Sequence, residues 1–131
     1  MSLPSPSRIQ TRSQQLAELA FKQVSRHENL PEKRRDEYIG FAKRFPSLVH
    51  SCGLAQAVAF AQSKAPDDYL NDLRAVMSSG TTDVAAFAAD IRTAELARYL
   101  QLSRTALQAA GWLKRYAEAL LDFDSMNSED K

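Results

Sequence analysis

The balance between apolar residue types most restricts the fold of this chain. Among its 131 residues, 20 Ala and 15 Leu stand against only eight Val and Ile taken together. Ala and Leu favour the α-helix, whereas β-branched side chains favour strands. The composition therefore predicts an all-α protein, and the length suits a single domain that buries its own core.

Prolines and apolar periodicity divide the chain into about six helices, which we expect to form one compact bundle. Three internal prolines stand where helices can begin, because the first helical turn does not use the N–H group that proline lacks. We expect the bundle to cover residues 8–122. It would lie between a disordered tail at residues 1–7 and an acidic, flexible tail at residues 123–131.

Residues with capping side chains predict where individual helices begin. We expect the first helix to start from Ser7, and Asn29 to cap the second. Asp67 or Asp68 is expected to cap the fourth helix, and Thr82 to start a short fifth one.

Two apolar stretches are expected to form most of the core. Between residues 48 and 61 few polar side chains interrupt the apolar ones, so we expect this third helix to be the central helix of the bundle. The last stretch is expected to break near Leu102, where Ser103 offers a cap, and then to resume. Trp112, Tyr116 and Phe123 widen the apolar face of that final helix, which should therefore touch two neighbours.

The cysteine count and the hydropathy exclude several classes of protein. Cys52 is alone, so neither an internal disulfide nor a thiolate metal site can form, and a reduced, cytoplasmic environment is expected. No apolar run reaches the roughly 18 to 20 residues that span a membrane. The first ten residues also lack a signal-peptide pattern. We expect a soluble protein without a membrane partner.

Residues that could carry catalysis are few. His27 lies in a charged stretch and is expected to be a solvated residue at a helix end, whereas His50 is expected to be a hydrogen-bonded structural residue. Neither has a carboxylate or a second His four residues later. Asp67, Asp68 and Asp72 could imitate a cation site, but helix capping explains them better.

Signatures of a cofactor are missing from the sequence. It contains no glycine-rich phosphate-binding loop and no dinucleotide fingerprint, and Cys52 is best explained as a small buried apolar residue. We therefore expect a binding or scaffolding protein with no enzyme activity, metal, cofactor or small-molecule substrate. The enzyme alternative would need a concave pocket with clustered titratable groups, centred on His50 and Cys52.

Basic side chains carry the strongest signal for binding. Residues 1–65 contain ten Lys and Arg against five Asp and Glu, whereas residues 66–131 contain seven against eleven. The cations that stand out are Lys33, Arg34, Arg35, Lys43, Arg44, Lys64, Lys114 and Arg115. Such side chains can neutralise nucleic-acid phosphates without reading bases. The alternative is a solvated helix face with pairs four residues apart, such as Lys114 with Glu118 and Lys33 with Glu37.

Two blocks of sequence carry a resemblance to a known family. Residues 41–56, FAKRFPSLVHSCGLAQ, and residues 112–119, WLKRYAEA, resemble in order and separation the small all-helical subunit of type III-B CRISPR effectors, the Cmr complex. The likeness spans roughly residues 8–122. A Lys-Arg-apolar-Pro-Ser step followed by Gly-Leu is not a generic helix pattern, and neither is a later Trp-Leu-Lys-Arg.

The resemblance implies a helical bundle without catalytic activity in an antiviral ribonucleoprotein. Several copies would stack into a minor filament beside the backbone and large subunits, with a basic face along the channel that holds guide RNA and target RNA. The cations in the matched blocks are expected to contact the RNA backbone. They are Lys43, Arg44, Lys114 and Arg115.

A second group of cations lies outside the matched blocks and rests on charge clustering alone. It consists of Lys33, Arg34, Arg35 and Lys64. The matched blocks should also supply the core residues that hold the first group in place. These are Phe41, Phe45, Leu48, Leu54, Trp112 and Leu113. Gly53 is expected to be structural, allowing a close approach or a bend after Pro46.

One other class of function fits the same sequence. A helical adaptor that binds only protein partners would share the fold and would need no RNA contact. It would present an exposed apolar groove, and its basic surface would form no continuous track.

Overall fold

The computed structural model describes residues 10–122, apart from the side chain of Asp67, and all of their regular secondary structure is helical. Its helices are α1 (Arg12–Ser25), α2 (Glu32–Cys52), α3 (Leu54–Lys64), α4 (Asp67–Met77), α5 (Val84–Thr93) and α6 (Leu96–Tyr116). The chain continues from α6 into a short π-helix, η2 (Ala117–Leu121). The prediction of an all-α bundle of about six helices is confirmed. The tails expected at residues 1–7 and 123–131 lie outside the described residues.

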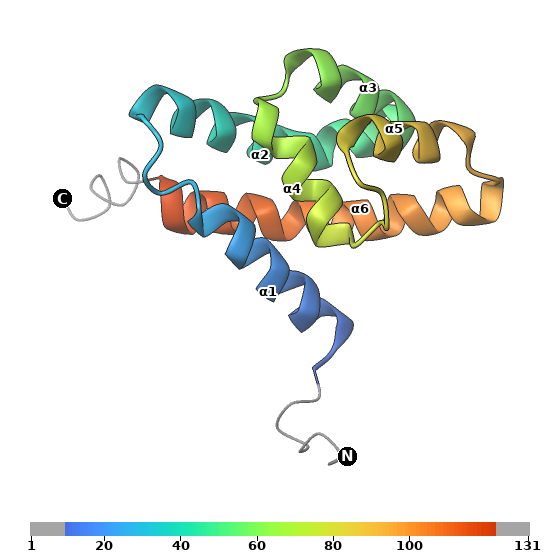
Figure 1. The fold of residues 1–131 in the computed structure, drawn as a ribbon, viewed down its shortest axis with the longest axis horizontal. Helices are drawn as coiled ribbons and strands as arrows, with labels where there is room; N and C mark the ends of the chain where they lie inside the picture. The colour runs from blue at the N-terminus through green and yellow to red at the C-terminus, as the bar shows by residue number, and fades with distance from the viewer. Residues whose placement is uncertain (1–9, 123–131) are drawn as a thin grey trace.

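The longest axis of the molecule follows α6, as Figure 1 shows, with α2 running in the opposite direction above it. In this view α1 crosses α6 obliquely, whereas α3 and α5 lie on the side of the molecule away from α6. α6 packs against α1, α2 and α4. The core is therefore built around α6, not around the helix that the sequence indicated as central.

The continuity of α6 differs from the expectation of a break near Leu102. Leu102 is buried inside an unbroken helix, and Ser103 lies in the next position without ending it. The side chains that α6 buries are Leu102, Ala106, Ala109, Ala110 and Leu113. These small and apolar residues recur at helical spacing and let neighbouring helices approach closely, which outweighs the capping tendency of a single Ser.

The third helix was also predicted wrongly. α2 passes through Pro46 and ends only at Cys52, so the segment that starts at Leu48 is the end of one helix and the beginning of another. Pro46 removes one N–H donor from the helix, but burial of Phe45 and Val49 on either side offsets that loss. α3 buries only one face, and Phe60 on this helix is 41% exposed.

Gly53 separates α2 from α3. Its backbone has φ +85° and ψ 162°, a conformation that L side chains rarely adopt, and its N–H group donates to the Val49 carbonyl at 2.9 Å. The hydroxyl of Tyr99, on α6, accepts a hydrogen bond from the Ala55 N–H group at 3.0 Å. Gly53 therefore has the structural role expected of it, but it ends the helix and does not bend it.

The capping residues differ from most of the predictions. Thr11 caps α1 in a reciprocal pair with Gln14, and Asp83, not Thr82, caps α5 by accepting from the Ala86 N–H group at 2.8 Å. Pro31 and Pro66 stand at the N-cap positions of α2 and α4, without side-chain hydrogen bonds. Asn29 and Asp67 or Asp68 are therefore not the caps, and the prolines that replace them fix the extended backbone at each helix start. Ser7 lies outside the described residues.

A buried polar cluster joins the loop after α1 to α2 and α4. Asp72 is fully buried, and its Oδ2 atom lies 2.6 Å from the Tyr38 hydroxyl and 2.7 Å from Nε2 of His27. Because an ionised carboxylate only accepts hydrogen bonds, the hydroxyl and the ring N–H group both donate to it. Arg26 approaches Oδ1 at 3.4 Å from the solvent side.

The observed cluster differs from the expectations for two residues, His27 and Asp72. His27 is 5% exposed, so it is a buried hydrogen-bonding residue and not a solvated one. Asp72 is neither a cap nor part of a cation site, because its oxygens serve His27, Tyr38 and Arg26. Burial, followed by the charge of Asp72 and its hydrogen bond, raises the pKa of Tyr38 well above its ordinary value. Tyr38 therefore stays protonated and keeps donating.

Two buried tyrosines allow a matched test of this cluster. Tyr38→Phe removes a donor to a buried carboxylate and should lower the free energy of unfolding by about 2 kcal/mol. Tyr69→Phe should change it by less than about 0.5 kcal/mol, or raise it, because the Tyr69 hydroxyl is buried without a hydrogen-bond partner among residues 10–122. Urea unfolding followed by circular dichroism measures both values, and losses of equal size would contradict the role of Asp72.

Two glycines on α2 and at its end test the boundary between α2 and α3. Gly53→Ala forces a side chain into a left-handed conformation and should cost about 1–3 kcal/mol. Gly40→Ala lies within the helix, where an added Cβ meets nothing within 4 Å, and should stabilise by about 0.5–1 kcal/mol. The midpoints of thermal unfolding should therefore move in opposite directions, and a tolerated Gly53→Ala would show that the boundary does not require glycine.

Candidate nucleic-acid interface

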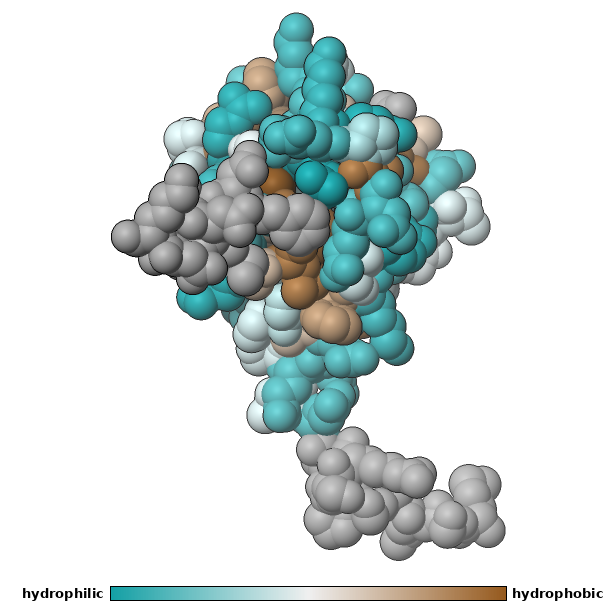
Figure 2. Space-filling view, turned by 90° about the vertical axis from the view of Figure 1, so that its left-hand side faces the viewer, coloured by the Kyte–Doolittle hydropathy of each residue, from teal (hydrophilic) through white to brown (hydrophobic). Residues whose placement is uncertain are grey.

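The four cations of the matched blocks lie on two helices that pack against each other. Lys43 and Arg44 are in the middle of α2, and Lys114 and Arg115 are in the last turn of α6. All four side chains are exposed. Figure 2 views the end of the molecule where α2 begins and α6 finishes, and shows mainly hydrophilic side chains around a smaller apolar area.

Few carboxylates compete for these cations. Lys43 Nζ lies 3.6 Å from Asp122 Oδ2, with 45% of the lysine side chain exposed. Arg44 lies over the ring of Phe41 at 5.8 Å, a cation–π contact that leaves its charge available. Neither Lys114 nor Arg115 forms an ion pair within residues 10–122, so the alternative in which Glu118 pairs with Lys114 is not seen there. Asp122 is only 19% exposed, so Lys43 must give up a partly buried carboxylate before it contacts a phosphate.

The aromatic and aliphatic residues of the matched blocks form the core beneath these cations. Phe41, Phe45, Leu54 and Leu113 are buried, and Leu48 and Trp112 pack partly buried against them. The prediction that these six residues pack together is confirmed. Because Phe41 and Phe45 are anchored in the interior, the helical positions of Lys43 and Arg44 between them are fixed.

The cations of the second group lie in three different surroundings in the structure. Arg34 and Lys64 line one hollow together with Arg44, between α2 and the connection from α3 to α4. Lys33 lies on an open surface beside the carboxylates of Glu32, Asp36 and Glu37. Arg35 is half-buried and donates through Nη1 to the Leu30 carbonyl at 3.3 Å, which ties the loop before α2 to the helix.

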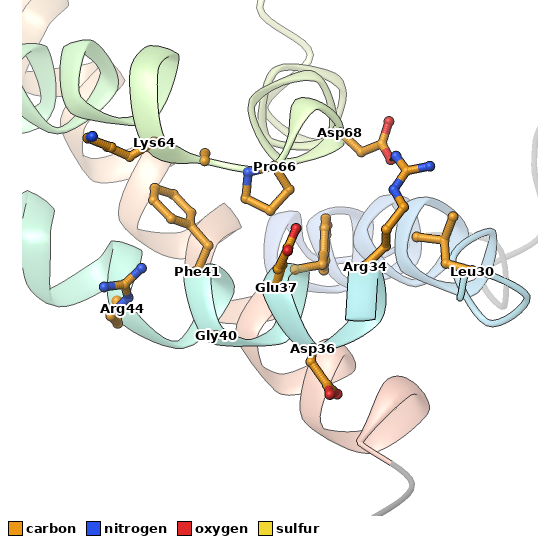
Figure 3. A pocket seen from close by; sticks show the side chains of 12 residues that line it. Leu30, Arg34, Asp36, Glu37, Gly40, Phe41, Arg44, Lys64, Pro66 and Asp68 are labelled. Atoms are coloured by element: carbon orange, nitrogen blue, oxygen red, sulfur yellow. The ribbon is translucent and has the colours of Figure 1, made fainter. Parts of the chain in front are cut away.

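The first hollow, of about 560 Å³, has charges of both signs. Figure 3 shows Lys64 and Arg44 at one end, on either side of Phe41, and Arg34 beside Asp68 at the other. Arg34 Nη2 lies 3.6 Å from Asp68 Oδ2, so this arginine is already paired. The end with Lys64 and Arg44 is therefore the one that can take an anion.

A second, smaller hollow of about 270 Å³ adjoins the first and shares Phe41 and Arg44 with it. Its other lining residues are Phe45, Ser47, Leu48, Ser51 and Phe60. No carboxylate lines it. Sequence reasoning missed this site, because Phe60 lies in the apolar stretch that we expected to be buried.

The residues considered for catalysis form no open site in the described part of the chain. His27 and Asp72 are hydrogen-bonded to each other but almost closed to solvent. His50 is exposed, and Cys52 is half-buried with its thiol 3.1 Å from the Leu48 carbonyl. Between residues 10 and 122 no three His, Cys, Asp or Glu side chains are grouped so that they could hold a metal ion. Within the same range no helix is both long and apolar enough to cross a membrane.

Comparison with known proteins extends the resemblance seen in the two blocks. Residues 12–120 match the family model described as CRISPR-associated protein (Cas_Cmr5). The chain is 39% identical over 117 residues to the CRISPR system Cmr subunit Cmr5 of Thermus thermophilus, an alignment that covers 87% of this chain and 99% of that protein.

The fold agrees with the sequence. The crystal structure of a CRISPR-associated Cmr5 family protein from Thermus thermophilus superposes with a TM-score of 0.77 at 39% identity. The superposition covers 86% of this chain and 99% of that one. The family indicated by residues 41–56 and 112–119 is thereby confirmed: the chain belongs to the Cmr5 family of CRISPR-associated proteins.

Proposed function

We propose that this chain is a non-catalytic small subunit of a type III-B CRISPR effector, the Cmr complex, acting in the cytoplasm in antiviral defence. The observation that carries the proposal is the family match over residues 12–120, joined to a relative named as a Cmr subunit. Its partners are the backbone and large subunits of that complex, further copies of itself, guide RNA and target RNA.

The contact with RNA is made by phosphate neutralisation. Lys43, Arg44, Lys114 and Arg115 supply the charges, and their exposure on two packed helices supports this role. Arg44 lies on a rigid helix, over the buried Phe41 ring, so little conformational freedom is lost when it meets a phosphate. This contact reads no bases, because the sequence-specific edges of RNA are not needed for it.

The second group of cations contributes unequally. Lys64 extends the basic end of the first hollow next to Arg44 and adds to the RNA contact. Arg34 must first give up its pair with Asp68, and Lys33 stands among three carboxylates, so both contribute less. Arg35 mainly holds the loop before α2.

Stacking of copies into a minor filament is part of the proposal, and the charge distribution along the chain supports it. The excess of basic residues before residue 66 and of acidic residues after it favours attraction between copies. A head-to-tail contact between copies uses two different surfaces and does not have to close into a ring. It can therefore continue along an extended RNA.

A helical adaptor that binds only protein is the second candidate. Leu96 and Leu100, four residues apart at the start of α6, are 73% and 47% exposed. Two large apolar side chains on one helical face fit a contact with another protein. This surface can serve subunit contacts in either function, so the RNA experiment below decides between them.

Reversal of the four main cations tests the RNA contact. Lys43→Glu, Arg44→Glu, Lys114→Glu and Arg115→Glu combined should weaken target-RNA capture by the reconstituted Cmr complex and flatten its salt dependence. Each lost phosphate contact lowers the slope of log K against log salt by about 0.7 to 0.9. Filter binding over a series of salt concentrations measures both effects.

A charge-matched control separates the local contact from net charge. Arg12, Lys22, Arg92 and Arg104 are also exposed, so their combined reversal to Glu changes the net charge equally. That variant should keep the salt slope of the wild type. Equal losses in both variants, or no loss in either, would contradict a phosphate contact at the four main positions and favour the adaptor.

A further inference from the structure

The second hollow is lined by a large aromatic side chain, Phe60, that is not buried in the core. Phe60 is 41% exposed, and its ring lies nearly parallel to that of the buried Phe41, at 12° and 6.4 Å between centroids. An exposed phenyl ring alone is ordinary on a protein surface. Phe60 differs because it lines a concave site, and because a buried ring holds it in position.

The surroundings of Phe60 suit a flat, partly polar ligand. The hollow measures about 270 Å³, close to the lower limit of roughly 300 Å³ for small-molecule pockets. Phe60, Phe41 and Leu48 supply its apolar lining. Ser47 and Ser51 add hydroxyl groups that can donate or accept hydrogen bonds.

The charge around the hollow selects an anionic partner. Arg44 is its only charged lining residue, and Lys64 follows Phe60 by one helical turn on α3. An aromatic face beside two cations is the arrangement by which proteins hold single-stranded nucleic acid, with bases stacked and phosphates neutralised. A neutral apolar side chain of a protein partner would make no use of Arg44, Lys64 or the two serine hydroxyls.

We propose that the hollow formed by Phe60, Phe41, Arg44, Ser47 and Ser51 binds one unpaired base of single-stranded RNA, stacked on Phe60, with Arg44 and Lys64 on the adjoining phosphates. This inference rests on the proposed RNA contact and adds a site that distinguishes single-stranded RNA from a duplex. A base inside a duplex is already stacked on both faces, so only an unpaired base can enter.

Fluorescence of a stacked base tests the site directly. The full-length chain is titrated into a single-stranded octauridine RNA that carries one central 2-aminopurine, whose emission falls when it stacks. Phe60→Leu keeps apolar packing but has no aromatic face, so it should abolish the quenching and weaken binding by roughly fivefold or more. Phe60→Trp keeps an aromatic face, so it should retain both the quenching and the affinity of the wild type. The salt slope should stay the same in both variants, because stacking releases no counterions.

Phe21 provides the matched control. It is 43% exposed on α1 and contacts Tyr116, but it lines neither of the two hollows. Phe21→Leu should leave the quenching unchanged and the affinity within about twofold of wild type. A duplex of the same sequence should show no loss on Phe60→Leu.

The outcomes separate this site from the broader RNA contact. Unchanged quenching and affinity in Phe60→Leu, with loss in the variant of Lys43, Arg44, Lys114 and Arg115, would overturn the base site and leave the phosphate contact standing. No binding of the single strand by the wild-type chain would overturn the base site, whereas the phosphate contact is decided by the four-cation variant in the reconstituted complex. If Phe60→Leu binds RNA normally but fails to enter the reconstituted complex, the hollow binds a protein partner and the proposal is wrong. A loss seen only with the matching DNA strand would also overturn it.

Discussion

The buried carboxylate of Asp72 is the constraint on which the arrangement of the helices depends. It is fully removed from solvent and accepts hydrogen bonds from His27 and Tyr38, which belong to the loop after α1 and to α2. An unpaired charge at this place would be costly, so α1, α2 and α4 must meet in the one arrangement that brings both donors to it. Apolar packing alone tolerates many small rearrangements, whereas this cluster does not.

The position of α2 in turn sets the direction of the basic residues. Tyr38, which donates to Asp72, lies on the buried face of α2, as do Phe41 and Phe45 further along. With that face fixed, Arg44 projects towards α3, where it lines both hollows. The polar cluster therefore shares α2 with the Lys43 and Arg44 part of the candidate RNA surface, and a rotation of α2 would disturb both together.

The fold class and the core could be predicted from the sequence, but not the boundaries that create the candidate site. Ala and Leu content and the spacing of Phe41, Phe45 and Leu113 follow from local preferences and from burial, which act the same way in any helical bundle. The helix break at Gly53 depends on a left-handed backbone and on Tyr99 from a distant helix. Contacts far apart in sequence, such as His27 with Asp72, leave no periodic signal.

A net charge of only +1 makes the geometry of the cations more important than their number. Long-range attraction for RNA is weak at this charge and is screened further at physiological salt. In the proposed function, contacts by Lys43, Arg44, Lys114 and Arg115 become effective when neighbouring subunits hold the chain next to the strand, because this raises the effective concentration of each weak contact. The proposed pocket for an unpaired base would contribute differently, since stacking on Phe60 is not screened by salt. With the proposed pocket, the isolated chain should bind a single strand mainly by stacking, and the phosphate contacts should add to that binding once the complex is assembled.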